Sequence, residues 1–182
     1  YIETYSPTLT IIHSTVTPGT TKLITELTKA KVVHSPVRGV HPNLYEGLKC
    51  FVKCIGGEDT HAVDLTKQHY DELEISYQIF NGSAATELAK ILSTTYYGMC
   101  IAFHNDINML CDQYNVNYDE VATQWNRTYN EGYKKLGMEN VVRPVLYPPK
   151  DSKIGGHCVI PNAELCKKFF DSKVLDYILE LK

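Results

Sequence analysis

The stretch SAATELAKILSTTYYGMCIAFHNDINMLCDQY, residues 83–114, has the apolar spacing of one long amphipathic helix. Its apolar residues recur every three or four positions, at Leu88, Ile91, Leu92, Met99, Phe103, Ile107, Leu110 and Cys111. Ser83 follows Asn81-Gly82 and is a good N-cap residue. At 1.5 Å per residue, such a helix extends roughly 48 Å. A small domain cannot cover a helix of this length on all sides, so we expect part of it to pack on another helix or subunit.

The composition argues against several kinds of partner. A formal net charge of −3 gives no basis for binding nucleic acid or an anionic membrane. No apolar run approaches the roughly 18 residues of a membrane span, and the first residues lack the basic leader of a signal peptide. The six cysteines are dispersed through expected helices and strands, as in reduced proteins. We therefore expect a cytoplasmic protein with neither nucleic acid nor membrane as a partner.

Residues 1–82 predict strands that alternate with helices. Strands are expected at 8–16, 31–34, 48–55 and 75–80, helices at 20–30 and 60–73, and a polar loop at 38–47. Short connections between such elements imply right-handed crossovers in a mostly parallel sheet. This half of the chain is therefore expected to be an α/β domain.

The pattern changes after Gly82, which we take as the boundary to an all-α domain at 83–182. Beyond the long helix we expect a second helix at 117–135, a proline-containing irregular segment at 137–153, and closing helices at 163–170 and 172–181. The predicted fold class is α/β followed by all-α: a truncated Rossmann-like parallel sheet plus a long-helix dimerisation domain.

Three separated motifs resemble the UDP-glucose/GDP-mannose dehydrogenase family. The first, HSTVTPGTT at 13–21, is similar to a strand–helix turn late in that family's NAD domain. The second, ELAK at 87–90 with AFHND at 102–106, resembles the long helix of its central domain. The third, IGGHC at 154–158, resembles the turn that carries the catalytic cysteine. Their order and spacing agree over nearly the whole chain, which begins at Tyr1 and looks like a middle piece of the family's sequence.

The resemblance implies an NAD-dependent enzyme that oxidises the 6-hydroxyl of a nucleotide sugar to an aldehyde and then to an acid. Cys158 would hold the aldehyde as a thiohemiacetal and then as a thioester. Lys90 would assist the thiolate and polarise the oxyanion or water, and Thr15 would lie near the nicotinamide or the catalytic water. The implied substrate-binding positions are Thr94, Asn105, Gly155, Gly156 and Asn162. NAD is the implied cofactor, and no metal is expected.

Three positions depart from the family's pattern. Thr94 stands where an asparagine usually holds the oxyanion, Asn162 where an aspartate assists hydrolysis, and Val37 where a glutamate follows Ser-Pro. These 182 residues also contain no G-x-G-x-x-G turn, which binds the phosphates of a dinucleotide at a helix N-terminus. We therefore expect the 182 residues alone to show no NAD-dependent oxidation of a nucleotide sugar.

Two classes of function stay open at this point. One is a divergent or partial nucleotide-sugar 6-dehydrogenase, favoured by Thr15, Lys90 and Cys158. The other is a non-catalytic oligomerisation module derived from that family, favoured by the three departures. Both predict a homodimer through the 83–114 helix.

Single residues also have plainer interpretations. Lys90 could be a solvated helix lysine paired with Glu87, and Cys158 a small buried side chain. The enzyme hypothesis instead predicts that Lys90 and Cys158 line one cleft with Thr15. The ammonium and the sulfur would then be on the order of 10 Å apart or less, because both must reach one reacting carbon.

Overall fold

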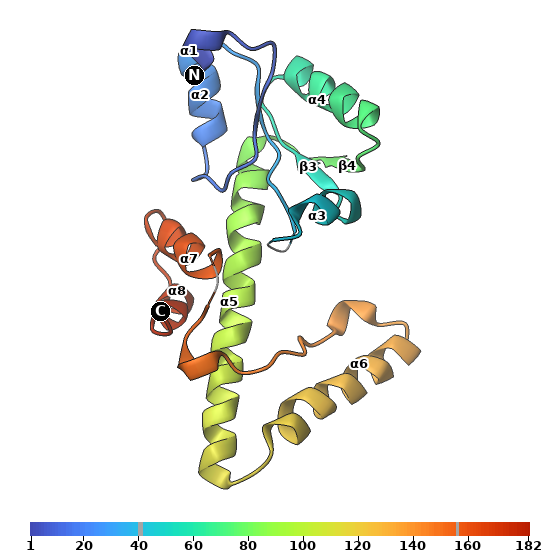
Figure 1. The fold of residues 1–182 in the computed structure, drawn as a ribbon, viewed down its shortest axis with the longest axis vertical. Helices are drawn as coiled ribbons and strands as arrows, with labels where there is room; N and C mark the ends of the chain where they lie inside the picture. Colours follow the sequence, from blue (N-terminus) through green and yellow to red (C-terminus); the bar gives the residue numbers. More distant parts are fainter. Residues whose placement is uncertain (40–41, 156) are drawn as a thin grey trace. The chain divides into compact units, whose positions relative to one another are not determined.

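The computed structural model describes residues 1–39, 42–155 and 157–182. The chain forms two compact units, Tyr1–Leu92 and Ser93–Lys182. The predicted long helix is confirmed as α5 (Ser83–Tyr114), which contributes residues to both units (Figure 1). The domain boundary expected at Gly82 coincides with the start of α5 and stays a prediction.

The first unit contains short parallel strands in two pairs. β1 (Thr10–Ile12) pairs with β2 (Val32–His34), and β3 (Lys53–Ile55) pairs with β4 (Tyr77–Ile79). An antiparallel bridge joins His34 to Gly56. The mixed α/β class is confirmed, and β2 agrees with its prediction within one residue, whereas β1, β3 and β4 are shorter than predicted. The fully buried Val32, Val33 and Ile55 form the centre of this unit.

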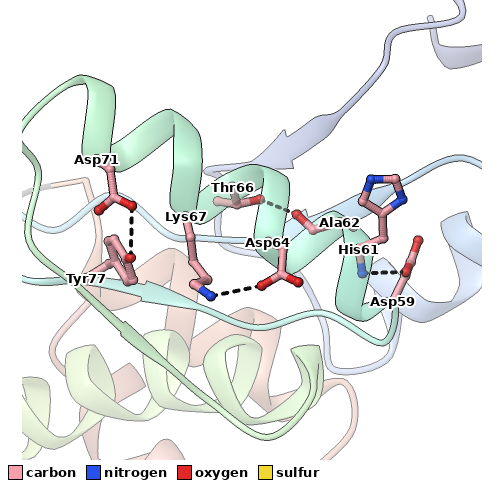
Figure 2. A network of polar contacts seen from close by, with 8 residues as sticks. All are labelled: Asp59, His61, Ala62, Asp64, Thr66, Lys67, Asp71 and Tyr77. Atoms are coloured by element: carbon pink, nitrogen blue, oxygen red, sulfur yellow. Dashed lines mark hydrogen bonds and ion pairs between the residues drawn. The ribbon is translucent and has the colours of Figure 1, made fainter.

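The described helices of this unit are α1 (Ile2–Tyr5), α2 (Thr20–Thr28), α3 (Leu44–Cys50) and α4 (Thr60–Glu72). The predictions for α2 and α4 are confirmed within two residues. Asp59 caps α4 by accepting the His61 backbone N–H at 2.9 Å. Figure 2 shows this cap, the contact of Lys67 with Asp64 within α4, and the hydrogen bond from Tyr77 of β4 to Asp71 of α4.

Helix α3 corrects the end of the loop predicted at 38–47 and the start of the strand predicted at 48–55, whose last three residues form β3. Its first turn carries Glu46 and its last turn carries Lys49, which suits the helix dipole. Gly47 packs against the backbone of Arg38 and Gly39, where a Cβ would meet backbone atoms at 2.8–2.9 Å. A side chain at position 47 would therefore clash with this backbone, and the weak local alternation of apolar residues does not indicate such a contact.

The second unit contains the later turns of α5 and a series of shorter elements. These are the π-helix η1 (Asp119–Gln124), α6 (Trp125–Lys135), the 3-10 turns η2 (Glu139–Val141) and η3 (Lys150–Ser152), α7 (Val159–Lys167) and α8 (Lys173–Leu179). The helix expected at 117–135 is therefore present with a π-helical first part. The irregular segment at 137–153 is also present, whereas α7 begins four residues earlier than expected.

Helices α7 and α8 are held in place by contacts with α5. A Cβ on Gly98 would lie 2.5 Å from Val159 and 3.3 Å from Ile178, so glycine is what lets α7 and α8 approach this turn of α5. Val159 and Ile178 are both buried there. The start of α7, where Cys158 lies, is therefore fixed by packing on a single glycine.

The expected N-cap of α5 is not formed by Ser83. The Ser83 backbone N–H and hydroxyl both donate to Glu58 Oε1, at 3.0 and 2.9 Å. A carboxylate from a distant part of the sequence thus satisfies the first turn of the helix.

Among the described helices, none combines the length and apolar character that crossing a membrane requires.

Candidate functional site

In the first unit, the backbone carbonyls of residues 35–37 accept hydrogen bonds from two lysine ammonium groups. Lys90 Nζ donates to the carbonyl of Val37 at 2.8 Å. Lys53 Nζ donates to the carbonyls of Ser35 and Pro36, at 2.8 and 3.1 Å. Lys90 is half-buried, so the plainer interpretation of a solvated lysine is wrong. Two positive charges, those of Lys53 and Lys90, therefore lie against the turn in which Val37 stands at the position of the family's glutamate.

Lys53 is almost completely buried beside this turn, with 2% of its surface exposed. Burial, with a smaller contribution from the positive charge of Lys90, lowers its pKa to about 8. His13 Nδ1 lies 3.4 Å from the Lys53 ammonium and 2.7 Å from the Ser35 carbonyl oxygen. Burial, followed by the charges of Lys53 and His69, lowers the pKa of His13, so its imidazole is neutral at pH 7.

The lowered pKa of Lys53 predicts a stability that rises with pH. The unfolded side chain keeps its proton up to about pH 10.4, whereas the folded one releases it from about pH 8. Between these values the unfolded chain binds more protons, so the free energy of unfolding increases, by up to about 3 kcal/mol. Urea unfolding of the wild type from pH 7 to 10 should show this rise.

Lys53→Met should abolish most of the rise between pH 8 and 10. Lys67→Met, the same change on the outer face of α4, should leave it intact. Above about pH 10, buried Tyr70 opposes the trend because burial raises its pKa. Equal pH profiles for the wild type and Lys53→Met would contradict the assignment.

Glu87 of α5 accepts hydrogen bonds from the N-terminus of α2. Its carboxylate accepts the backbone N–H of Gly19 at 2.7 Å, and the N–H and hydroxyl of Thr21 at 2.8 and 2.7 Å. Gly19 has φ 91°, a conformation that favours glycine. Because Glu87 is fully buried, a solvated ion pair with Lys90 is excluded. The same carboxylate occupies the end of α2 where a phosphate group could otherwise bind.

Thr15 lies just beyond β1, at the carboxyl edge of the β1–β2 pair, where ligands bind in open α/β sheets. Its neighbour Ser14 is held by buried His34, whose Nε2 lies 3.1 Å from the Ser14 carbonyl oxygen. His34 Nδ1 lies 2.9 Å from the hydroxyl of Thr86 on α5. Burial lowers the pKa of His34. The backbone beside Thr15 is thus tied to α5, the helix that carries Lys90.

Cys158 lies exposed at the start of α7 in the second unit, so the plainer interpretation of a buried cysteine is wrong. Asn162, one turn further along, donates its side-chain N–H to the hydroxyl of Thr94 at 2.8 Å. The two substituted positions of the second unit are therefore in direct contact beside the first turn of α7. Thr15 and Lys90 belong to the first unit, so the common cleft with Cys158 stays a prediction.

The other expected substrate-binding positions of the second unit differ in their surroundings. Gly155 borders a groove of about 570 Å³ whose lining includes Tyr97, Tyr147, Lys150 and Lys153. A Cβ on Gly155 would meet nothing within 4 Å, so its lack of a side chain is not needed for packing. Gly156 lies outside the described residues. Asn105 is buried, with its side-chain N–H 3.7 Å from the sulfur of Met109.

Sequence analysis did not identify Lys53 or Glu87 as parts of this region. Lys53 carried one available signal, because it interrupts the apolar run that ends in Ile55. Glu87 was noted only as part of the ELAK motif, and its binding to α2 could not be inferred because its partners lie 66 and 68 residues away. Among the described residues, no group of three or more His, Cys, Asp or Glu side chains could hold a metal ion.

Comparisons with known proteins show which proteins the chain is similar to. Residues 84–164 match the profile of the UDP-glucose/GDP-mannose dehydrogenase family, central domain. A UDP-N-acetyl-D-mannosamine dehydrogenase of Pyrococcus horikoshii is 28% identical over 162 residues, which cover 83% of this chain and 35% of the relative. A second, from Methanococcus maripaludis, is 28% identical over 154 residues, 83% of this chain and 33% of the relative. The chain thus spans about a third of the length of these relatives.

Solved structures show the same fold. A solved structure of UDP-D-ManNAc dehydrogenase from Pyrococcus horikoshii superposes with a TM-score of 0.76, covering 95% of this chain and 41% of that one, at 24% identity. A UDP-glucose dehydrogenase from Pyrobaculum islandicum gives a TM-score of 0.71 at 19% identity, covering 95% and 40%. The motifs and the family profile agree, and residues 84–164 match the central domain of the UDP-glucose/GDP-mannose dehydrogenase family.

Proposed function

We propose that this chain carries the part of a nucleotide-sugar 6-dehydrogenase that contains its catalytic cysteine. The observation that carries the proposal is the exposed Cys158 at the start of α7, with the Asn162–Thr94 hydrogen bond one turn away. The names of the relatives suggest a UDP-N-acetylhexosamine as the substrate.

Cys158 would act as the nucleophile on the 6-aldehyde. Its thiolate adds to the carbonyl carbon, and the oxyanion so formed takes up a proton to give a thiohemiacetal. Oxidation of this adduct to a thioester, and its hydrolysis to the acid, would require a bound hydride acceptor. Thr94 and Asn162 are polar but uncharged, so they can donate hydrogen bonds to an oxyanion without changing the net charge. Lys90 would supply the cation, as the resemblance implies.

The family's hydride acceptor is NAD, and the described residues provide only part of a site for it. Thr15 lies at the carboxyl edge of the β1–β2 pair, which suits a residue next to a nicotinamide. The N-terminus of α2 does not suit the phosphates, because the carboxylate of Glu87 already accepts its N–H groups. We therefore derive no hydride-transfer step from these residues.

Alkylation by iodoacetamide tests the proposal, because the chain carries its own control. Cys158 and Cys50 are both exposed thiols, whereas Cys100, Cys111 and Cys166 are buried. UDP-N-acetyl-D-mannosamine should slow alkylation of Cys158 by about fivefold or more, because a ligand in the site covers its sulfur. Alkylation of Cys50 should not change. Peptide mass spectrometry measures both rates, and equal rates with and without ligand would contradict a substrate site at Cys158.

We also propose a homodimer through α5. Several large apolar side chains of this helix are exposed in the second unit, among them Phe103, Met109, Leu110 and Tyr114. Apolar patches of this kind mark interaction surfaces, and a second copy of the chain presents the same patch. The non-catalytic oligomerisation module would use the same surface.

Sedimentation measures the dimer directly. The wild type should exceed the monomer mass of 20.6 kDa at tens of micromolar. Leu110→Lys should weaken association about tenfold or more, because it places a charge on the apolar surface. Gln113→Lys adds the same charge at a polar exposed position of α5 and should leave association unchanged. A monomeric wild type at these concentrations would count decisively against the proposal.

A further inference from the structure

The ammonium of Lys53 is a buried charge that the proposed chemistry does not use. Only 2% of the residue is exposed, so Lys53 cannot itself contact a substrate. Among the described residues no carboxylate forms an ion pair with it. Replacing buried charged groups by apolar side chains of similar size is often neutral or stabilising. The charge of Lys53 is therefore not needed merely to fill this space.

The turn at residues 35–37 is held from two sides. The N–H groups of Ser35 and Val37 donate to the carbonyls of residues 12–13, at 2.9 and 3.1 Å, just beyond the paired strands β1 and β2. The carbonyls of Ser35 and Pro36 accept from Lys53, at 2.8 and 3.1 Å. The hydroxyl of Tyr70 also donates to Ser35 Oγ at 2.9 Å. Lys53 thus fixes the carbonyl side of the turn, as the segment after β1 fixes its N–H side.

Lys90 binds the next carbonyl of the same turn, that of Val37, at 2.8 Å. The carbonyls of Pro36 and Val37 belong to successive planar peptide groups, so the orientation of one restricts the orientation of the other. The two ammonium groups also repel each other, and this repulsion contributes to the lowered pKa of Lys53. Lys53 therefore acts on Lys90 in two ways, through the backbone of the turn and through its charge.

The other titratable groups around Lys53 are the side chains of His13, His34, Cys54, Tyr70 and Lys90. Lys90 alone among them is positively charged at pH 7, because burial lowers the pKa of both histidines. The charge of Lys53 itself is present at pH 7 and is lost as the pH rises through about 8, the pKa of this side chain in the folded chain. The coupling between the two lysines can therefore be changed by pH alone.

We propose that Lys53 is a positioning residue for Lys90. It orients the carbonyls of Ser35 and Pro36, and through them the carbonyl of Val37 that binds the Lys90 ammonium. This role rests on the proposed function, in which Lys90 supplies the cation. Val37 has no polar side chain, so its carbonyl is the acceptor that this position offers to a lysine.

Trace acetylation with acetic anhydride, read by peptide mass spectrometry from pH 7 to 11, measures the reactivity of Lys90 in the full chain. Lys53→Met should raise the limiting rate at high pH by about threefold or more, because an amine that is held less often is reached more often. Lys67→Met on the outer face of α4 should leave the rate unchanged. Exposed Lys22 should react equally in all variants, which controls for the reagent.

Lys53→Arg separates position from charge. A guanidinium can donate to both carbonyls, so the limiting rate should return toward that of the wild type, but it stays charged at every pH of the experiment. In the wild type Lys53 loses its charge from about pH 8, before the range in which a lysine ordinarily becomes reactive. The half-point of Lys90 labelling should therefore move about half a pH unit lower in Lys53→Arg. A purely structural role of Lys53 would not move it.

Lys90→Met tests the same coupling without changing the buried residue. The rise in the free energy of unfolding that begins near pH 8 should begin about half a pH unit higher, because the positive neighbour of Lys53 is gone. Lys22→Met removes an exposed lysine of α2 and should leave the profile unchanged. Circular dichroism identifies any Lys53 variant that fails to fold, and in that case Lys90→Met decides.

Either of two results would overturn the proposal. One is the same labelling profile of Lys90 in the wild type, Lys53→Met and Lys53→Arg. The other is an unchanged pH profile of stability in Lys90→Met. Neither measurement involves Cys158 or a substrate. If the labelling and stability shifts are found but the nucleotide sugar does not protect Cys158, the proposed function fails, whereas the hold of Lys53 on Lys90 is established.

Discussion

Glu87→Gln should destabilise the first unit by about 3 kcal/mol, because charge-assisted hydrogen bonds are worth about 1.5–3 kcal/mol each. Both carboxylate oxygens accept from N–H or O–H groups of Gly19 and Thr21. A glutamine has only one oxygen, so its amide N–H₂ must face one of these donors. The substitution therefore removes a hydrogen bond, leaves a buried donor unpaired, and takes a negative charge away from the N-terminus of α2.

Hydrogen exchange read by mass spectrometry measures this effect unit by unit. Peptides that cover α2 should lose protection in Glu87→Gln, whereas peptides that cover α7 and α8 should not. The matched control is Glu26→Gln, which changes an exposed carboxylate of α2 whose pair with Lys22 is 4.0 Å long. It should cost less than about 0.5 kcal/mol. Equal effects of the two substitutions would show that Glu87 does not hold α2.

Two glycine-to-alanine substitutions in the second unit should change stability in opposite directions. Alanine favours a helix by about 1 kcal/mol over glycine. At Gly132 of α6 a Cβ meets nothing within 4 Å, so Gly132→Ala should stabilise the unit by up to about that amount. At Gly98 the Cβ would lie 2.5 Å from Val159, so Gly98→Ala should destabilise it by about 1–3 kcal/mol.

Urea unfolding followed by the fluorescence of Trp125, the only tryptophan, measures both variants. Gly98→Ala should also increase hydrogen exchange in α7 and change the alkylation rate of Cys158, because Val159 directly follows that cysteine. A stabilising Gly98→Ala would mean that α7 does not rest on this turn of α5.

Local sequence patterns were enough to predict the helices in which the apolar spacing is regular. The bounds of α5 are those that the apolar spacing predicted, and α2 and α4 differ by two residues or fewer. These helices could be predicted because their periodicity is a local property of neighbouring residues. The motifs also identified the family, since they record chemistry in short stretches of sequence.

The hydrogen-bond partners of the buried polar groups, in contrast, depend on contacts that form only in the folded chain. Glu58, and not Ser83, caps α5, because a carboxylate 25 residues away reaches its first turn. Lys53 is buried against carbonyls 17 and 18 residues distant, which lowers its pKa. Helix α3 lies where the end of a loop and the start of a strand were predicted, and its Gly47 packs on the backbone of Arg38 and Gly39. Each of these outcomes depends on a contact between residues that are not neighbours in the chain. The spacing of apolar residues within one segment gives no information about such a contact.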